Sequence, residues 1–162
     1  MTDSPDQPQY GITPIAEMAK MPGIDFVRAI FEGRQPQPPI MQGVKPFDCT
    51  VEPGVAVLHA TPSLQHYNPI GSVHGGFAAA MLDSACGCAV HSKLSPAQAY
   101  TTLELKISFI RALSADVGPV HAEGIVLSVG RRVGFSEAKI TDADGRLYAS
   151  ASSTCLIFDR NR

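Results

Sequence analysis

The sequence predicts an α+β protein in which an antiparallel sheet wraps around one long central helix. The segment 73–94 has no proline and is apolar on nearly every side, which is typical of a buried helix. Two predicted strands precede it and four follow it. The short turns between successive strands favour antiparallel pairing. A single helix that is apolar all round needs a large, curved sheet to cover it.

Length and composition indicate one globular domain. The chain has 162 residues, of which 44% are hydrophobic and 17% are charged, so it can bury a real core. The formal net charge is -2, and no basic surplus favours nucleic acid or an anionic membrane as a partner. Apolar runs end well short of the roughly 20 residues that a membrane span needs. These features predict a protein that binds neither nucleic acid nor membrane.

The N-terminus and the cysteines favour a cytoplasmic protein. The first eight residues are acidic and polar, which is the wrong chemistry for a secretory signal. The four cysteines have neither the Cys-x-x-Cys spacing nor the His/Cys pairing of zinc sites. We therefore expect no metal, and we interpret the cysteines as small buried hydrophobic residues in a reducing compartment.

The N-terminal part of the chain is expected to stand apart from the main domain. Residues 1–40 are assigned as a tail and a short helix, and residues 41–162 as the main domain. The first 22 residues are rich in Pro, Gln and Asp and are expected to be poorly ordered. A short amphipathic helix is predicted over 25–32, with Asp25 as a candidate N-cap.

Two strands, 41–51 and 54–60, are predicted before the long helix, joined by a turn at Glu52-Pro53-Gly54. Beyond the helix, the segment 99–110 alternates without interruption. Leu103, Leu105, Ile107 and Phe109 fall on one face, and Thr102 falls with the polar residues on the other.

The last three strands are predicted over 117–129, 133–141 and 146–158. A strong hairpin signal, Asp-Ala-Asp-Gly at 142–145, separates the last two. No internal repeat interrupts this order.

The most informative stretch lies where a polar loop enters the long helix. Asn68 and His74 lie in the loop, Gly75 and Gly76 follow, and Asp83 is the one carboxylate inside the apolar segment. Glycine lets a ligand approach the backbone, and a helix start presents unpaired N–H groups with a positive dipole end. This pattern indicates a site for a polarised carbonyl oxygen with an acid-base group nearby.

Each of these residues also has a purely structural interpretation. Asp83 could be a buried hydrogen-bond acceptor, although a carboxylate in an apolar helix is costly unless paired, which favours function. Asn68 could be only a turn residue before a proline. His74 could cap the helix or be a buried imidazole, although an orienting role is favoured. The glycines could serve close packing alone, although approach to a ligand is favoured.

The spacing along the helix separates the two halves of this site. Asp83 follows Gly75 by eight positions, which corresponds to a rise of about 12 Å. A side chain as short as Asp cannot reach a carbonyl held at Gly75. If two chains pack their helices antiparallel, Gly75 of one can face Asp83 of the other. We therefore expect a homodimer with two shared sites.

The loop motif Asn-x-x-Gly-x-x-His-Gly-Gly, followed by a helix carrying Asp, resembles that of the hotdog-fold acyl-CoA thioesterases. The closer likeness is to the phenylacetate-pathway (PaaI-like) branch, and it covers roughly residues 44–158. The resemblance implies that the Gly75 N–H holds the thioester carbonyl and that Asp83 attacks it or activates water. Asn68 and His74 would hold the carbonyl or the water.

The resemblance also suggests further site residues. The family often places a hydroxyl on the strand after the helix, where Thr102 matches and Thr101 is an alternative. From the residues alone, a plain strand residue is the favoured interpretation of Thr102, and a role in binding water is the alternative. Arg131 and Arg132 fit the family's basic residues near CoA. Because they are adjacent, on a strand they would point to opposite faces, so at most one would meet a CoA phosphate.

The function predicted is hydrolysis of a small or medium acyl-CoA to free acid and CoA. No separate cofactor is expected, because CoA is part of the substrate, and a dimer of dimers is the expected assembly. A thiolate is a good leaving group, so a lone carboxylate as base or nucleophile is adequate. Two alternatives stay open: a hotdog enoyl-CoA hydratase or dehydratase, and a non-catalytic acyl-CoA-binding regulator.

Overall fold

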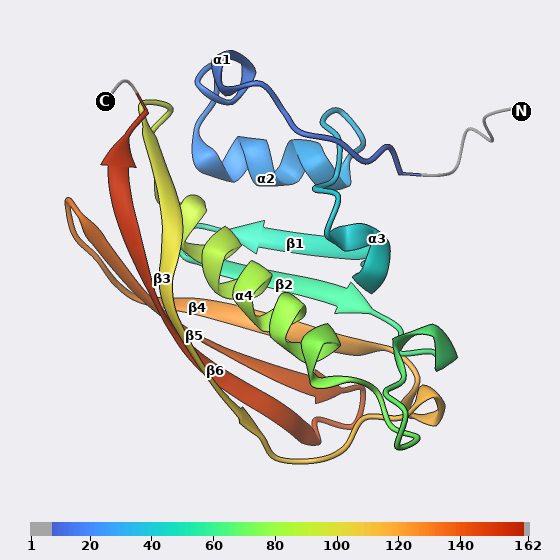
Figure 1. Cartoon of the computed structure of the whole chain (residues 1–162). Coiled ribbons are helices and arrows are strands. Elements are labelled where there is room, and N and C mark those ends of the chain that lie inside the picture. Colours follow the sequence, from blue (N-terminus) through green and yellow to red (C-terminus); the bar gives the residue numbers. More distant parts are fainter. Residues whose placement is uncertain (1–7, 161–162) are drawn as a thin grey trace, which may run out of the picture.

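The computed structural model describes residues 8–160 and shows a curved, open sheet wrapped around one long helix (Figure 1). In chain order the helices and strands are α1 (Ile15–Met18), α2 (Gly23–Phe31), α3 (Met41–Val44), β1 (Asp48–Glu52), β2 (Val55–Ala60), α4 (Gly75–His91), β3 (Gln98–Phe109), β4 (Val120–Val129), β5 (Val133–Asp142) and β6 (Leu147–Asp159). Short 3-10 turns at Leu64–His66 and Ala115–Val117 precede α4 and β4. No helix within residues 8–160 is long and apolar enough to cross a membrane.

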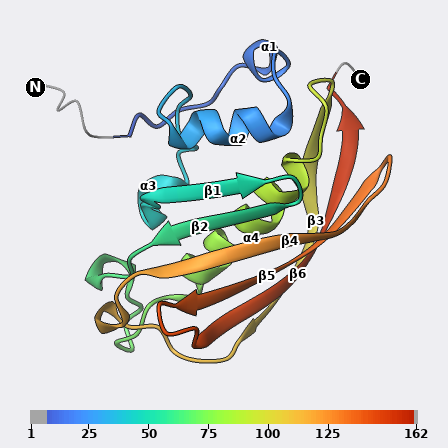
Figure 2. The same ribbon diagram turned by 180° about the vertical axis from the view of Figure 1, so that it is seen from behind.

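The sheet has six strands in the order β1-β2-β4-β5-β6-β3, and every neighbouring pair is antiparallel. Seen from behind, its strands pass in front of α4 and partly hide the helix (Figure 2). The prediction of an antiparallel sheet around one helix is therefore confirmed. The two edges of the sheet differ. Helix α2 packs beside β1, whereas β3 pairs with β6 and has no second strand beside it within residues 8–160.

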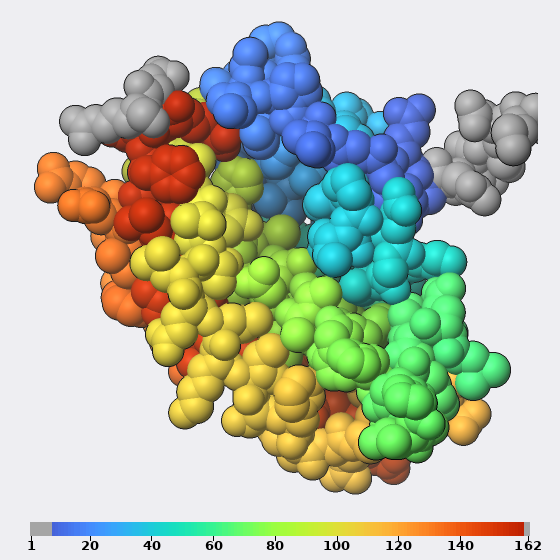
Figure 3. Space-filling view, in the orientation of Figure 1, coloured from blue at the N-terminus to red at the C-terminus, as the bar shows by residue number. Residues whose placement is uncertain are grey.

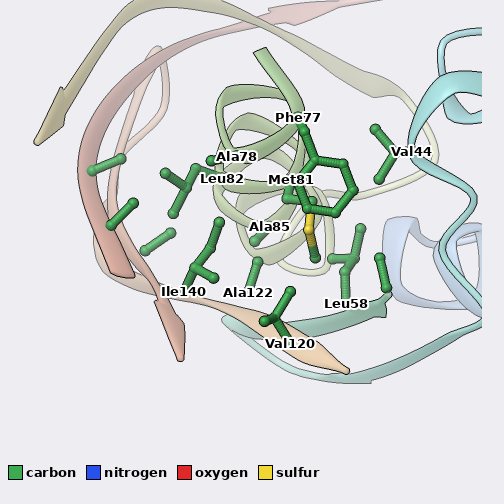
Figure 4. Close-up of a cluster of buried hydrophobic side chains, with 14 of the residues drawn as sticks. Val44, Leu58, Phe77, Ala78, Met81, Leu82, Ala85, Val120, Ala122 and Ile140 are labelled. Atoms are coloured by element: carbon green, nitrogen blue, oxygen red, sulfur yellow. The ribbon is translucent and has the colours of Figure 1, made fainter. Parts of the chain in front are cut away.

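The core lies between α4 and the concave face of the sheet (Figure 4). Met81, Leu82 and Ala85 on the helix are fully buried against strand residues such as Ala122 and Ile140. The helix and β4 approach so closely at Gly124 that a Cβ there would lie 2.3 Å from the carbonyl oxygen of Ala85. Only glycine tolerates that approach, which fixes the distance between α4 and the middle of the sheet.

The long helix is shorter than predicted. It begins at Gly75 and ends at His91, where the sequence suggested 73–94. The turns at Gly54 and Gly145 occur as predicted, each with the glycine at positive φ. Residues 41–44, predicted as strand, instead form helix α3. Lys45 ends α3 in the left-handed conformation, and β1 starts only after Pro46.

The alternation along β3 is broken by a β-bulge. The register against β6 shifts between Thr102 and Glu104, so Leu103 is an extra residue and is 61% exposed. The bulge moves Thr102 onto the same face as the half-buried Leu105 and Ile107, toward α4. The uninterrupted alternation predicted from the sequence, with Thr102 facing the other way, is wrong at this point.

The N-terminal residues lie against the end of the molecule where α4 finishes (Figure 3). Helix α2 starts two residues earlier than predicted, and Pro22 occupies the N-cap position, so the proposed Asp25 cap is wrong. Asp25 instead lies 3.9 Å from the Arg28 guanidinium, one turn along the helix. Residues 8–22 follow a defined path, against the expectation of poor order, and residues 1–7 of that prediction lie outside the described residues.

Candidate active site

The loop before α4 is closed by its own hydrogen bonds. The Asn68 Oδ1 accepts from the N–H groups of Ile70 and Ser72, and its Nδ2 donates to the Ser72 hydroxyl. The His74 N–H donates to the His66 carbonyl over 2.7 Å. The Asn68 side chain therefore shapes the loop. Within one chain it is not brought to Asp83.

His74 caps the long helix. Its backbone is extended, and its Nδ1 accepts a 2.8 Å hydrogen bond from the Gly76 N–H. The Phe77 N–H is bound by the His74 carbonyl. Of the helix's first three N–H groups, only that of Gly75 has no acceptor within residues 8–160. The helix thus begins with one free donor at the positive end of its dipole.

Gly75 and Gly76 each leave little room for a side chain, but different neighbours fill the space. A Cβ on Gly75 would lie 3.0 Å from the Phe109 ring at the end of β3, so the ring packs directly on the backbone. A Cβ on Gly76 would meet the His74 ring that caps it. The Gly76 N–H is used by the cap, so the donor available to a ligand is that of Gly75 alone.

Asp83 lies halfway along α4 and is half-buried. Its Oδ1 accepts a 2.9 Å hydrogen bond from the Thr102 hydroxyl, the side chain that the bulge turns inward. Within residues 8–160 it makes no other hydrogen bond and no salt bridge. The Thr102 bond fixes the carboxylate and leaves Oδ2 with no protein partner in this part of the chain.

The surroundings of Asp83 exclude a thiol nucleophile. Burial, and secondarily the charge of Asp83, raises the pKa of Cys88 to about 12, and burial raises the pKa of Cys86 to about 11. Burial also raises the pKa of the Tyr100 hydroxyl well above its usual range. At neutral pH these two thiols and the Tyr100 hydroxyl therefore keep their protons.

The arginine pair lies in the turn between β4 and β5, between the two strands as predicted, so the expectation that the two side chains point to opposite faces of a strand does not apply. Arg131 and Arg132 are exposed between the end of β4 and the start of β5, and the Arg132 carbonyl accepts from Ile157 of β6. The pairing of β5 with β6, and of β6 with the start of β3, places this turn at the end of the sheet where β3 begins.

Within one chain, Asp83 and Thr102 are brought together, and Asn68, His74 and Gly75 form a second group at the helix start. Eight residues of regular helix, a rise of about 12 Å, separate the two groups. The packing of Phe109 on Gly75 and the Leu103 bulge were not predicted. No residue type in the sequence marks the bulge, because the alternation continues through it.

Comparison with known proteins shows the family to which the chain belongs. A model of the thioesterase superfamily matches residues 70–149. A protein of Saccharolobus solfataricus, named "Putative esterase SSO2140", is 34% identical over 66% of this chain and 74% of its own length. The chain belongs to the thioesterase superfamily.

Other relatives agree with this membership. A Halobacterium salinarum protein, named "Putative esterase VNG_1336C", is 40% identical over 77 residues, and the match spans about half of that relative's length. A solved structure from Ralstonia eutropha, described as "a putative thioesterase, phenylacetic acid degradation-related protein", is 26% identical. It superimposes with a TM-score of 0.71 over 80% of this chain and 97% of its own. The expected likeness to the PaaI-like branch is confirmed.

The cap gives a test that does not depend on activity. Replacing His74 with Ala removes the acceptor for the Gly76 N–H, so the free energy of unfolding should fall by about 1 kcal/mol. His74→Asn keeps a side-chain acceptor at the cap, so its free energy of unfolding should fall less than that of His74→Ala. Urea denaturation measures both variants. Equal stability of His74→Ala and the wild type would show that the cap contributes nothing.

Proposed function

We propose that this thioesterase-superfamily chain hydrolyses acyl-CoA thioesters to the free acid and CoA. One observation carries the proposal. The long helix presents a free N–H at its first residue and, halfway along, a carboxylate with one unpartnered oxygen. Thioester cleavage needs a fixed donor facing the carbonyl oxygen and a base or nucleophile facing the carbonyl carbon.

In this proposal the Gly75 N–H binds the carbonyl oxygen and stabilises the charge that develops there. The Oδ2 of Asp83 either takes a proton from the attacking water or attacks the carbon itself to form an anhydride that water then opens. In both routes the C–S bond breaks, and the CoA thiolate leaves and takes up a proton. Thr102 holds Asp83 through Oδ1, and His74 positions Gly75 by capping the helix.

We further propose that each site is shared between two copies of the chain. The rise of about 12 Å keeps Gly75 and Asp83 of one chain apart. Strand β3 has a free edge, and an antiparallel second copy pairing along it would bring each helix start toward the other helix's middle. A homodimer is then the minimal active unit, and a dimer of dimers is the proposed assembly. In each shared site, Asn68 and Gly75 would come from the same chain, and Asn68 would help to hold the carbonyl or the water.

The arginine turn supports CoA as the carrier. Arg131 and Arg132 are exposed at the end of the sheet where β3 begins. Within the described residues neither makes a salt bridge. Guanidinium groups bind phosphates well, so this turn is a suitable contact for the CoA phosphates.

Asp83→Asn tests the carboxylate. Asn preserves the shape and can still accept from Thr102, but it cannot act as base or nucleophile. We expect kcat for acyl-CoA hydrolysis to fall by about 10²- to 10⁴-fold. The assay measures the CoA thiol that hydrolysis releases, with a thiol-reactive dye. Glu137→Gln, an exposed carboxylate on β5, is the matched control and should leave kcat unchanged. Near wild-type hydrolysis by Asp83→Asn would overturn the role of Asp83.

Gly75→Pro tests the N–H donor. Proline suits the first helical position, and His74 already has the extended backbone, with ψ of 137°, that a residue before proline prefers. Loss of one such donor should lower kcat by about 10²- to 10³-fold. Gly75→Ala adds a side-chain carbon against Phe109 but keeps the N–H, so it should stay much closer to the wild type. If the two variants lose activity equally, packing at Phe109 and not the N–H is responsible.

A further inference from the structure

A pocket of about 530 Å³ opens beside the start of β3. Its lining includes Ile15 and Met18 of α1, Phe26 of α2, Tyr100 and Thr102 of β3, and Phe158 of β6. Pockets of this size commonly hold small organic ligands. Thr102 is the residue whose hydroxyl donates to Asp83, so the inner wall of the pocket is one hydrogen bond from the proposed catalytic carboxylate.

The walls of the pocket are mainly apolar. Ile15 is 62% exposed and Phe158 is 42% exposed, so apolar surface faces the opening without cover from residues 8–160. His91 also lines the pocket, and burial, with a smaller effect from Arg160, lowers its pKa to about 4. It is therefore uncharged at neutral pH. Arg160, the charged lining residue, donates from its Nε to the Pro96 carbonyl.

The N-terminal segment, defined here as residues 8–31, is held firmly in place as one wall. The Gly23 N–H donates to the Leu94 carbonyl, and a Cβ on Gly23 would lie 1.9 Å from the His91 carbonyl oxygen. The Phe26 and His91 rings are tilted against each other at 5.4 Å between centroids, and His91 and Tyr100 at 5.3 Å. This row of rings joins the wall to the strand that carries Thr102.

The segment lies outside residues 70–149, the part of the chain that the superfamily model matches. The catalytic candidates Gly75, Asp83 and Thr102 fall inside that part. The proposed catalytic residues thus lie in the part of the chain that the family model matches, and the N-terminal wall of the pocket lies outside it.

We propose that the N-terminal segment forms the outer wall of the acyl-group pocket and selects uncharged, apolar acyl groups larger than acetyl. This inference rests on the proposed thioesterase function. An apolar acyl group entering the pocket buries its surface against Ile15, Met18 and Phe26 while its carbonyl stays near Asp83. An acetyl group is too short to reach this wall, so its hydrolysis does not depend on the segment.

Kinetics with Ile15→Glu test the selectivity. The substitution places a negative charge on the pocket wall. Because the Ile15 side chain is largely exposed, the fold should stay intact. We expect kcat/KM for hexanoyl-CoA or benzoyl-CoA to fall about tenfold, with acetyl-CoA unchanged. Ile12→Glu is the matched control, because Ile12 is 84% exposed on the same segment and does not line the pocket. The wild type should also prefer both apolar substrates to succinyl-CoA.

An equal loss on acetyl-CoA, no loss with Ile15→Glu, or a preference for succinyl-CoA would overturn the proposal. The comparison of hexanoyl-CoA with benzoyl-CoA shows whether the wall suits aliphatic or aromatic groups.

A binding experiment separates this inference from the proposed function. The chain contains no tryptophan, so Ile15→Trp introduces a single reporter at the wall. S-hexyl-CoA is a thioether that cannot be hydrolysed. Its hexyl group should shield the introduced tryptophan from water and shift the tryptophan emission to shorter wavelength, whereas S-methyl-CoA and free CoA should not. Ile12→Trp should respond to none of them. If no thioester is hydrolysed yet Ile15→Trp shifts, the proposed function fails and the pocket stands. If S-hexyl-CoA causes no shift, the pocket assignment fails.

Discussion

The close contact between α4 and the sheet determines where every functional group can lie. Gly124 allows the β4 backbone to reach the helix backbone at Ala85, and small residues on the helix allow the other strands to follow. Because the sheet buries most of the helix, a polar side chain or N–H group on the helix is costly unless it lies at an exposed end or has a hydrogen-bond partner on a strand. Asp83 has such a partner in Thr102, and Gly75 lies at the uncovered start.

The same packing is the basis of the proposal that each site is shared between two chains. A helix held straight by its surroundings keeps its first residue and its middle a fixed distance apart, and neither group can move to the other. The free edge of β3 is the surface on which a second copy can bring them together. The proposed dimer would complete each site and would also cover the exposed edge of β3.

Much of this architecture could be predicted from the sequence. The buried helix was recognisable from its lack of polar positions, and the hairpin turns from their glycines. The separation of Gly75 from Asp83 follows from helix geometry alone. The Leu103 bulge could not be predicted, because it depends on the register against β6 and leaves the alternation of residue types intact. Residues 41–44 were predicted as strand although only Val44 is a strong strand former, and the left-handed turn at Lys45 and the proline that follows end them as a short helix.

The N-terminal segment was the hardest part to predict from the sequence. Its prolines and polar residues suggest disorder, and its path is set by tertiary contacts such as the Gly23 approach to His91. The structure makes it one wall of a pocket whose opposite wall includes Thr102, the partner of Asp83.

The most direct test of the account is complementation between two inactive chains. Asp83→Asn and Gly75→Pro chains are unfolded together, refolded as an equal mixture and assayed for thioester hydrolysis. If sites are shared, half of the dimers are mixed and each has one intact site, so about a quarter of wild-type activity should return. If both groups act within one chain, every site is defective and the mixture stays as inactive as its parts, which would contradict the account.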